Sequence, residues 1–338
     1  MSSPLSPGEL QHALRDPAAS ERRSPLFGEP AVWVELGTEP AAELRDARAW
    51  QGLAELPAVS VGVATAGVAA GAEALAAALD VVVTDAGAQA TIAVTVERQP
   101  LASLVLAQLL RHSLARSVAD GLLAESLAYS TLQAGPEFAA WRATRRERKR
   151  EPEAEPAVLA RRDGAELTLV LNRPQKRNAF SAEMRDALCE ALAFVIRDDS
   201  LRRVVLSGAG PSFCSGGDLD EFGTLPDPAT AHAIRSTRNA AALLARVADR
   251  VEARVHGACV GAGVELPAFC RRVEADPGAF FQLPEVGLGL VPGAGGTVSL
   301  PRRIGRQRTA WLALTGQRLS AEHARAFGLV DEIVARRR

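Results

Sequence analysis

The stretch Phe281-Gln-Leu-Pro-Glu-Val-Gly-Leu-Gly-Leu-Val-Pro-Gly-Ala-Gly-Gly-Thr297 carries the strongest structural signal in the chain. A proline followed by a glutamate commonly opens a helix, because proline fits the first helical position. The glycines that follow Glu285 prevent a long helix here, because glycine weakens a helix interior. We therefore expect a glycine-rich loop that presents one carboxylate.

Two stretches upstream each combine a strand with a turn of small residues. They are Gly208-Ala-Gly-Pro-Ser-Phe-Cys-Ser-Gly-Gly-Asp-Leu219 and His256-Gly-Ala-Cys-Val-Gly-Ala-Gly-Val-Glu-Leu266. In the first, Gly216 and Gly217 expose backbone N–H groups that can donate to an anion. In the second, free N–H groups and the positive end of a helix dipole meet near Ala262. Two such donor sites at two strand ends can form an oxyanion hole.

A fourth motif, Asn172-Arg-Pro-Gln-Lys-Arg-Asn-Ala-Phe180, predicts a turn because Pro174 stops the preceding strand. Arg173, Lys176 and Arg177 then lie where they can pair with phosphates. Taken alone, this motif is a weak signal.

Around these motifs the chain alternates strands and helices, which predicts an α/β fold with parallel strands and crossover helices. The second half shows strands at 166–171, 203–207 and 251–255, and helices at 182–197, 229–248 and 265–270. The first half shows strands at 31–36, 58–63, 80–84 and 91–96, followed by a helical region from 100 to 141 that is broken at Asp120-Gly121 and Gly135-Pro136.

A length of 338 residues predicts about two domains. Charge and proline replace apolar periodicity at 144–156, so this segment is interpreted as a linker between an N-terminal α/β domain (1–143) and a core (157–338). Residues 68–76 also align without a gap on 260–268, which pairs Glu73 with Glu265. Either an internal repeat or chance recurrence in an alanine-rich chain explains this.

The composition excludes several classes of protein. The 39 basic and 40 acidic residues leave a net charge of −1, so no overall field attracts nucleic acid or an anionic membrane. The start of the chain lacks a signal peptide, and no long apolar run follows, which predicts a cytoplasmic protein. The histidines are scattered, so we expect no metal site. His256 could form a nucleophilic pair with Ser215, but its place at the end of a strand favours a packing role. The four cysteines lack CxxC spacing and are interpreted as core thiols: Cys189, Cys214, Cys259 and Cys270.

From Ala165 to Val334 the chain resembles the enoyl-CoA hydratase/isomerase (crotonase) superfamily. The resemblance rests on the RPxxxNAF, FCSGGDL and GAGVEL turns, on LPEVGLGLVPGAGGTVSLPRRIG, and on the closing LTG and GLVDE segments. It implies a ββα-superhelix core and an acyl-CoA thioester whose enolate is stabilised by the N–H groups of Gly217 and Ala262. Coenzyme A enters as part of the substrate, so no separate cofactor is expected. The implied CoA-binding residues are Lys176, Arg177, Ala179, Ser215, Gly216, Asp218, Leu219, Gly261 and Pro284.

Hydratases of this superfamily use two glutamates twenty residues apart, as Glu265 and Glu285 are here. Hydration needs two carboxyls, because water is activated at Cβ while a proton is delivered to Cα. The resemblance makes Glu265 the base that orients water and Glu285 the proton donor, with coupled titration. This favours a 2-enoyl-CoA hydratase or 3-hydroxyacyl-CoA dehydratase. A double-bond isomerase, another acyl-CoA lyase, or a non-catalytic acyl-CoA-binding scaffold stay as alternatives, and so does a purely structural role for both glutamates.

The chain departs from the superfamily pattern at two places. Pro267 and Arg271 stand where the family often reads ELALACD, and the chain stops at Arg338, where relatives usually continue into helices that cover the site and build a trimer. Segments 100–110 and 121–141 resemble those helices. Our hypothesis is that the first half is a reduced crotonase-like unit that supplies a structural lid. We expect a homo-oligomer, either a trimer or a hexamer.

Overall fold

The computed structural model describes residues 3–145, 155–224 and 227–335. Its main sheet has six strands in the order β12-β9-β7-β6-β5-β4, and all neighbours are parallel except the β4–β5 pair. A smaller sheet has the order β11-β10-β8. The strands of the main sheet are β4 (Val158–Asp163), β5 (Glu166–Leu171), β6 (Arg203–Gly208), β7 (Val251–Val255), β9 (Arg272–Ala275) and β12 (Glu332–Ile333), and those of the smaller sheet are β8 (Ala258–Val260), β10 (Phe280–Gln282) and β11 (Leu319–Ser320).

The strands predicted in the second half are confirmed, and the structure adds short strands and one long strand, β4, that were missed. In β5 alternate side chains are buried, as expected of a strand with one face on the core. The missed strand β4 pairs with β5 along its whole length, but most of its side chains are exposed. It therefore lacks the apolar alternation that identifies a strand in sequence.

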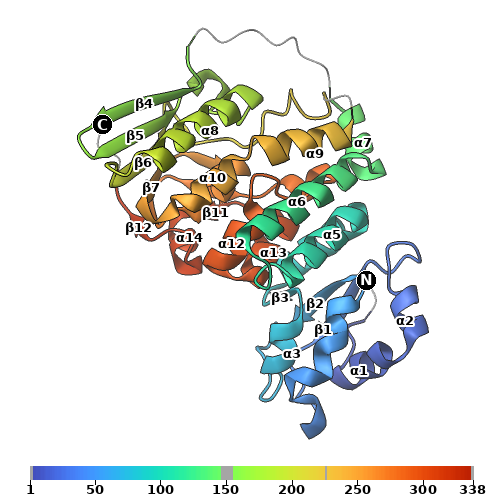
Figure 1. The fold of residues 1–338 in the computed structure, drawn as a ribbon. Coiled ribbons are helices and arrows are strands. Elements are labelled where there is room, and N and C mark those ends of the chain that lie inside the picture. Colours follow the sequence, from blue (N-terminus) through green and yellow to red (C-terminus); the bar gives the residue numbers. More distant parts are fainter. Residues whose placement is uncertain (1–2, 146–154, 225–226, 336–338) are drawn as a thin grey trace.

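Helices of the second half pack on the sheets (Figure 1). They are α8 (Ala182–Arg197), α9 (Pro228–Thr237), α10 (Ala240–Arg246), α11 (Ala262–Glu265), α12 (Gly296–Ile304), α13 (Arg306–Thr315) and α14 (Ala321–Phe327). The single helix predicted at 229–248 is two helices, because the Asn239 side chain caps a new N-terminus. The helix predicted at 265–270 is wrong in its bounds, since α11 ends at Glu265 and a 3-10 turn follows at Pro267–Phe269.

The first half builds a three-stranded parallel sheet and seven helices within the described residues. Its strands β1 (Ala31–Glu35), β2 (Val59–Val63) and β3 (Val81–Val83) agree with three of the four predicted strands. Its helices are α1 (Pro7–Arg15), α2 (Pro17–Arg22), α3 (Glu73–Ala78), α4 (Ala86–Arg98), α5 (Pro100–Arg111), α6 (Val118–Gln133) and α7 (Pro136–Ala143).

Two local predictions in this half are wrong. The strand predicted at 91–96 lies inside α4, because the Asp85 side chain caps that helix and Ala88, Ile92 and Val96 are buried at helical spacing. The break predicted at Asp120-Gly121 lies inside α6. A glycine serves there because a Cβ at position 121 would come within 2.9 Å of Val298 on α12.

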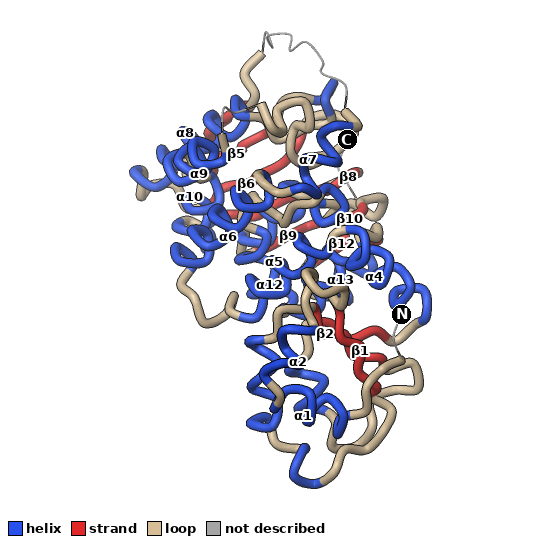
Figure 2. Tube along the Cα trace, turned by 90° about the vertical axis from the view of Figure 1, so that its right-hand side faces the viewer, coloured by secondary structure: helices blue, strands red, loops and turns tan. Residues whose placement is uncertain are grey.

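The buried apolar residues do not divide at the predicted linker. A smaller cluster is formed only by residues between Leu10 and Leu79. A larger cluster joins one face of the β1-β2-β3 sheet and helices α4–α7 to the second half of the chain. Figure 2 shows the β1-β2-β3 sheet toward one end of the molecule, with α5, α12 and α13 between it and the main sheet. Most of the predicted linker lies outside the described residues, and all four cysteines are free and buried, as expected.

A buried ion pair joins Asp80, directly before β3, to Arg111 at the end of α5. Arg111 donates to both carboxylate oxygens of Asp80, at 2.8 and 2.7 Å, and to the carbonyls of Leu56 and Ala58. Arg111→Ala leaves a carboxylate buried beside fewer donors, so we expect it to lower the free energy of unfolding by about 3–5 kcal/mol. Urea unfolding followed by tryptophan fluorescence measures this.

The matched control is Arg22→Ala, which removes an exposed pair with Asp16 at 3.0 Å. Exposed pairs contribute at most about 1 kcal/mol, so its midpoint stays close to that of the wild type. Equal shifts in the two variants would contradict an anchoring role for Arg111.

Candidate active site

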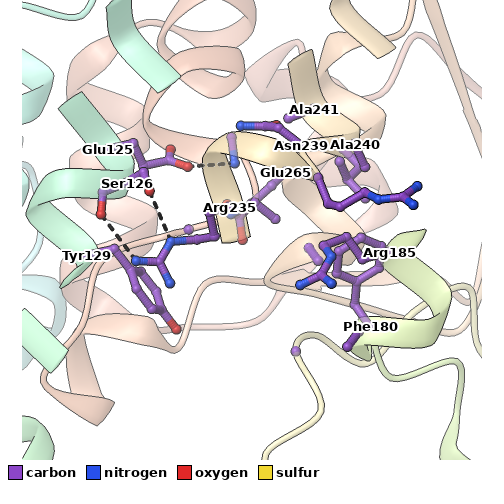
Figure 3. A pocket seen from close by; sticks show the side chains of 18 of the residues that line it. Glu125, Ser126, Tyr129, Phe180, Arg185, Arg235, Asn239, Ala240, Ala241 and Glu265 are labelled. Carbon is purple, nitrogen blue, oxygen red and sulfur yellow. Dashed lines mark hydrogen bonds between the residues drawn. The ribbon is translucent and has the colours of Figure 1, made fainter. Parts of the chain in front are cut away.

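One cavity takes its walls from both halves of the chain (Figure 3). The turn after β6 contributes Gly217, the start of α11 contributes Ala262, and the two glutamates predicted from sequence both line the cavity. The contribution of α6 consists of Leu122, Glu125, Ser126, Tyr129 and Gln133. Glu73, which the internal alignment pairs with Glu265, is exposed and lies outside this cavity.

Short β-bridges bring the two donor turns together. Cys214 pairs with Cys259, and Phe180 pairs with Gly217. Within the described residues, neither the N–H of Gly217 nor that of Ala262 has a protein acceptor. Ala262 is the first residue of α11, where an N–H lacks an intrahelical partner. Both N–H groups are therefore free to donate to a ligand atom.

Glu265 ends α11 and is almost fully buried, with 2% of its surface exposed. Its Oε2 accepts hydrogen bonds from the backbone N–H groups of Ala294 at 2.7 Å and Gly296 at 2.8 Å. The glycine-rich loop predicted after Glu285 thus folds back and holds the other glutamate. These two bonds favour the ionised form of Glu265.

Glu285 opens a 3-10 turn that ends at Leu288. Its Oε2 is buried and has no hydrogen-bond partner within the described residues. Gly261 lies against Oε1 with φ +50°, and a Cβ at that position would overlap the carboxyl oxygen. A glycine before α11 is therefore required both for backbone conformation and for space.

Burial raises the pKa of both glutamates. It raises the pKa of Glu285 to about 8, and the nearby charge of Glu125 acts in the same direction. Burial, followed by the charges of Glu285 and Glu125, also raises the pKa of Glu265 well above its ordinary value, although the two backbone N–H groups oppose this. Both carboxyls therefore take up a proton more readily than a free glutamate does. The two backbone N–H groups favour the negative charge on Glu265, and the lack of a partner for the Glu285 Oε2 among the described residues favours the proton on Glu285.

The structure separates the predicted CoA-binding residues into two groups. Asp218 lines the cavity, but its carboxylate is held by Arg173 at 3.0 Å. Arg173 is itself buried and also donates to the carbonyl of Ala179, so its suggested place beside phosphates is wrong. The remaining residues lie on the adjoining turns and not among the lining residues: Lys176, Arg177, Ala179, Ser215, Gly216, Leu219, Gly261 and Pro284.

Two of the predicted basic residues are exposed on the turn between β5 and α8. Lys176 and Arg177 are exposed, and Lys176 Nζ lies 3.6 Å from Asp220. Arg177 and Asn178 adopt left-handed backbone conformations, with φ of 51° and 55°. The Ser215 Oγ donates a hydrogen bond to the Lys176 carbonyl at 3.4 Å. His256 Nε2 is hydrogen-bonded to the Gly210 carbonyl, which agrees with a packing role for His256.

Three polar residues stand out among the cavity residues that were not predicted from sequence. Glu125 and Tyr129 lie on α6, and Arg235 lies on α9. Arg235 is stacked over the Tyr129 ring, with its guanidinium 4.7 Å from the ring centroid. The sequence signal that could have identified Glu125 was an acidic residue on an apolar helix, because acidic residues are uncommon on a buried helix face.

The order of turns, the paired glutamates and the free N–H groups agree with a match over residues 164–338 to the family described as enoyl-CoA hydratase/isomerase. The chain belongs to the enoyl-CoA hydratase/isomerase family. The α/β crotonase-like fold and the family predicted from sequence are confirmed, and membership supports the prediction of an enzyme.

Several known proteins of this family are similar to the chain. The Bacillus subtilis (strain 168) protein YngF, named for the enoyl-CoA hydratase/isomerase group, is 38% identical over 49% of this chain. That match spans 65% of YngF, less than two thirds of its length. The 1,2-epoxyphenylacetyl-CoA isomerase of Escherichia coli (strain K12) is 38% identical over 52% of this chain and 69% of its own length. A crystal structure of Mycobacterium smegmatis enoyl-CoA hydratase superposes with a TM-score of 0.51 at 37% identity, over 54% of this chain and 71% of that one.

None of the helices in residues 3–145, 155–224 and 227–335 has the length and apolar run needed to cross a bilayer. In the same ranges, His, Cys, Asp and Glu side chains do not gather in threes as a metal site requires.

Proposed function

We propose that the chain hydrates 2-enoyl-CoA thioesters and, in reverse, dehydrates 3-hydroxyacyl-CoA. One observation carries this proposal. A single cavity holds two backbone N–H groups without acceptors among the described residues, and two buried carboxyls whose pKa values are both raised. Hydration across a conjugated double bond needs both features, because charge develops on the thioester oxygen while water adds at Cβ.

The thioester carbonyl oxygen accepts hydrogen bonds from the N–H groups of Gly217 and Ala262. These donors stabilise the enolate that forms when water adds to Cβ, and one such donor can contribute about 2.7–4 kcal/mol. Glu265, as the ionised partner, orients the water and takes its proton. Glu285 delivers a proton to Cα, and transfer of the proton from Glu265 to Glu285 restores the starting state.

The assignment of roles is supported by the hydrogen bonds of the two glutamates. Glu265 accepts from two backbone N–H groups, which stabilise its anion, whereas the Oε2 of Glu285 has no partner in the described residues. The pKa of Glu285, raised by burial to about 8, keeps this carboxyl protonated at neutral pH. We therefore expect the hydration rate to fall as the pH rises above about 8, where Glu285 loses its proton, and to fall also in acid, where Glu265 gains one.

The coenzyme A portion serves as the handle of the substrate, and we propose that no separate cofactor takes part. Lys176 and Arg177 are exposed on the turn beside the cavity, where they can pair with the phosphates of coenzyme A. We also propose that the protein is a cytoplasmic homo-oligomer.

The test is the loss of enoyl-thioester absorbance with a panel of 2-enoyl-CoA chain lengths. Hydration predicts turnover on at least one member and formation of the 3-hydroxyacyl-CoA product. The same panel in the 3-enoyl series tests the alternative, because an isomerase creates the conjugated absorbance instead of removing it. Binding of CoA esters without turnover in either series would favour a scaffold and overturn the proposal.

A further inference from the structure

We propose that Glu125, supplied by the first half of the chain, is a positioning residue for this chemistry. It holds the start of α12 in the conformation that keeps the Glu265 carboxylate in place. The inference rests on the proposed function, and it gives the first half a role beyond covering the site.

Two buried carboxylates share the backbone N–H groups at the start of α12. Glu265 accepts from Ala294 and Gly296, at 2.7 and 2.8 Å. Glu125 accepts from the N–H groups of Gly295 and Thr297, at 2.7 and 2.9 Å, and from the Thr297 hydroxyl at 2.7 Å. Four consecutive N–H groups therefore alternate between a carboxylate of the first half and one of the second.

The turn between them has no spare room. Gly295 has φ +100°, a conformation that favours glycine. A Cβ at Gly293 would come within 2.5 Å of the Tyr129 ring on α6, and one at Gly296 would come within 2.6 Å of Glu265 Cγ. Helix α6 and Glu265 thus both pack closely against this turn. A change in the peptide orientation at Gly295 is therefore transmitted to the carboxylate of Glu265.

Glu125 also acts through its charge. It is 3% exposed, and burial raises its pKa to about 7, against the effect of its three hydrogen bonds and of Arg235. Arg235 is fastened to α6 by hydrogen bonds to Ser126 Oγ at 3.1 Å and to Ser130 Oγ. Its positive charge favours the ionised form of Glu125, which in turn raises the pKa of both Glu265 and Glu285.

Other titratable groups face this region from the surrounding elements. His232 on α9 bonds Ser126 at 2.9 Å. Further charged residues that line the cavity are Arg185, Asp218, Glu221 and Arg238. Asp218 is paired with Arg173, and Arg185 with Asp186 at 2.8 Å, so each carries a compensated charge. Glu125 is the carboxylate that bonds the same turn as Glu265, so its removal changes both the geometry and the local charge.

The test compares Glu125→Gln with Glu137→Gln. Glu137 is the matched control, because it also caps a helix within the same half, through the N–H groups of Leu101 at 2.6 Å and Ala102 at 2.9 Å, but does not line the cavity. A glutamine at 125 cannot accept from all three donors. We expect kcat to fall tenfold or more in Glu125→Gln with KM changed less than threefold, and Glu137→Gln to keep wild-type kcat.

The pH profile separates positioning from mere stabilisation of the fold. Loss of the negative charge at 125 lowers the pKa of Glu285, so the alkaline limb of kcat moves to lower pH in Glu125→Gln but not in Glu137→Gln. A kcat within twofold of the control and an unmoved alkaline limb would overturn the proposal.

An activity-independent measurement keeps the proposal distinct from the proposed function. The infrared carboxyl band that disappears in Glu285→Gln identifies Glu285, and its titration is compared in the wild-type and Glu125→Gln backgrounds. A downward shift in the pKa of Glu285 supports the positioning role even if no enoyl-CoA is hydrated. Titration at the same pH in both backgrounds would contradict it.

Discussion

Glu285→Gln is expected to reduce kcat for hydration by about 10²–10⁴-fold, the range that general acid catalysis supplies. The amide has nearly the shape of the carboxyl but cannot deliver a proton to Cα. The buried Oε2 of Glu285 has no hydrogen-bond partner in the described residues, so the amide group breaks no existing bond. We therefore expect the loss to appear in kcat, with little change in KM and no loss of fold. Initial rates of absorbance loss with the best 2-enoyl-CoA measure this.

The pH dependence gives the same prediction an independent check. Because the pKa of Glu285 is raised by burial to about 8, the wild-type rate falls above that pH. The residual rate of the variant lacks this alkaline limb. The control is Glu322→Gln on α14, where the glutamate is exposed and does not line the cavity. A variant at 285 that retained wild-type kcat would leave Glu285 without a role in proton transfer.

Ala262→Pro is expected to lower kcat by about 10²–10³-fold, because it removes one N–H from the oxyanion hole. Proline suits this position, since Ala262 is the first residue of α11 and its N–H has no acceptor among the described residues. The preceding Gly261 has φ 50° and ψ −117°, outside the α region that a following proline disfavours. The substitution therefore removes a donor while leaving the helix its intrahelical hydrogen bonds.

The control for this variant is Ala86→Pro. Ala86 is likewise the first residue of a helix, α4, and follows Asp85 in an extended conformation. It is exposed and lies outside the cavity lining. We expect wild-type kcat from it, and melting temperatures of both proline variants report whether the helix starts are tolerated. A folded Ala262→Pro protein with unchanged kcat would contradict the assignment of its N–H to the thioester oxygen.

Short-range sequence features predicted the turns that build the site. The glycines and the small residues around Gly217 and Ala262 predict strand–turn–helix units, because they act through local backbone conformation. The family resemblance pointed to Glu265 and Glu285 as paired carboxyls, and both line one cavity. Local patterns failed where tertiary packing outweighed propensity. Residues 91–96 alternate like a strand but form part of α4, whose buried side follows a helical period.

The local sequence was sufficient to predict the α/β class and the turns, since each depends on residues near one another in the chain. The order of those turns carried the family resemblance, and the resemblance implied the pair of glutamates. Two features came only from the folded chain. Arg173 turned inward to Asp218, 45 residues away, rather than outward to phosphate. Glu125 met Gly295 across 170 residues of sequence. Such pairings depend on how α6 packs against α12, and packing is a property of the whole core that no local pattern encodes.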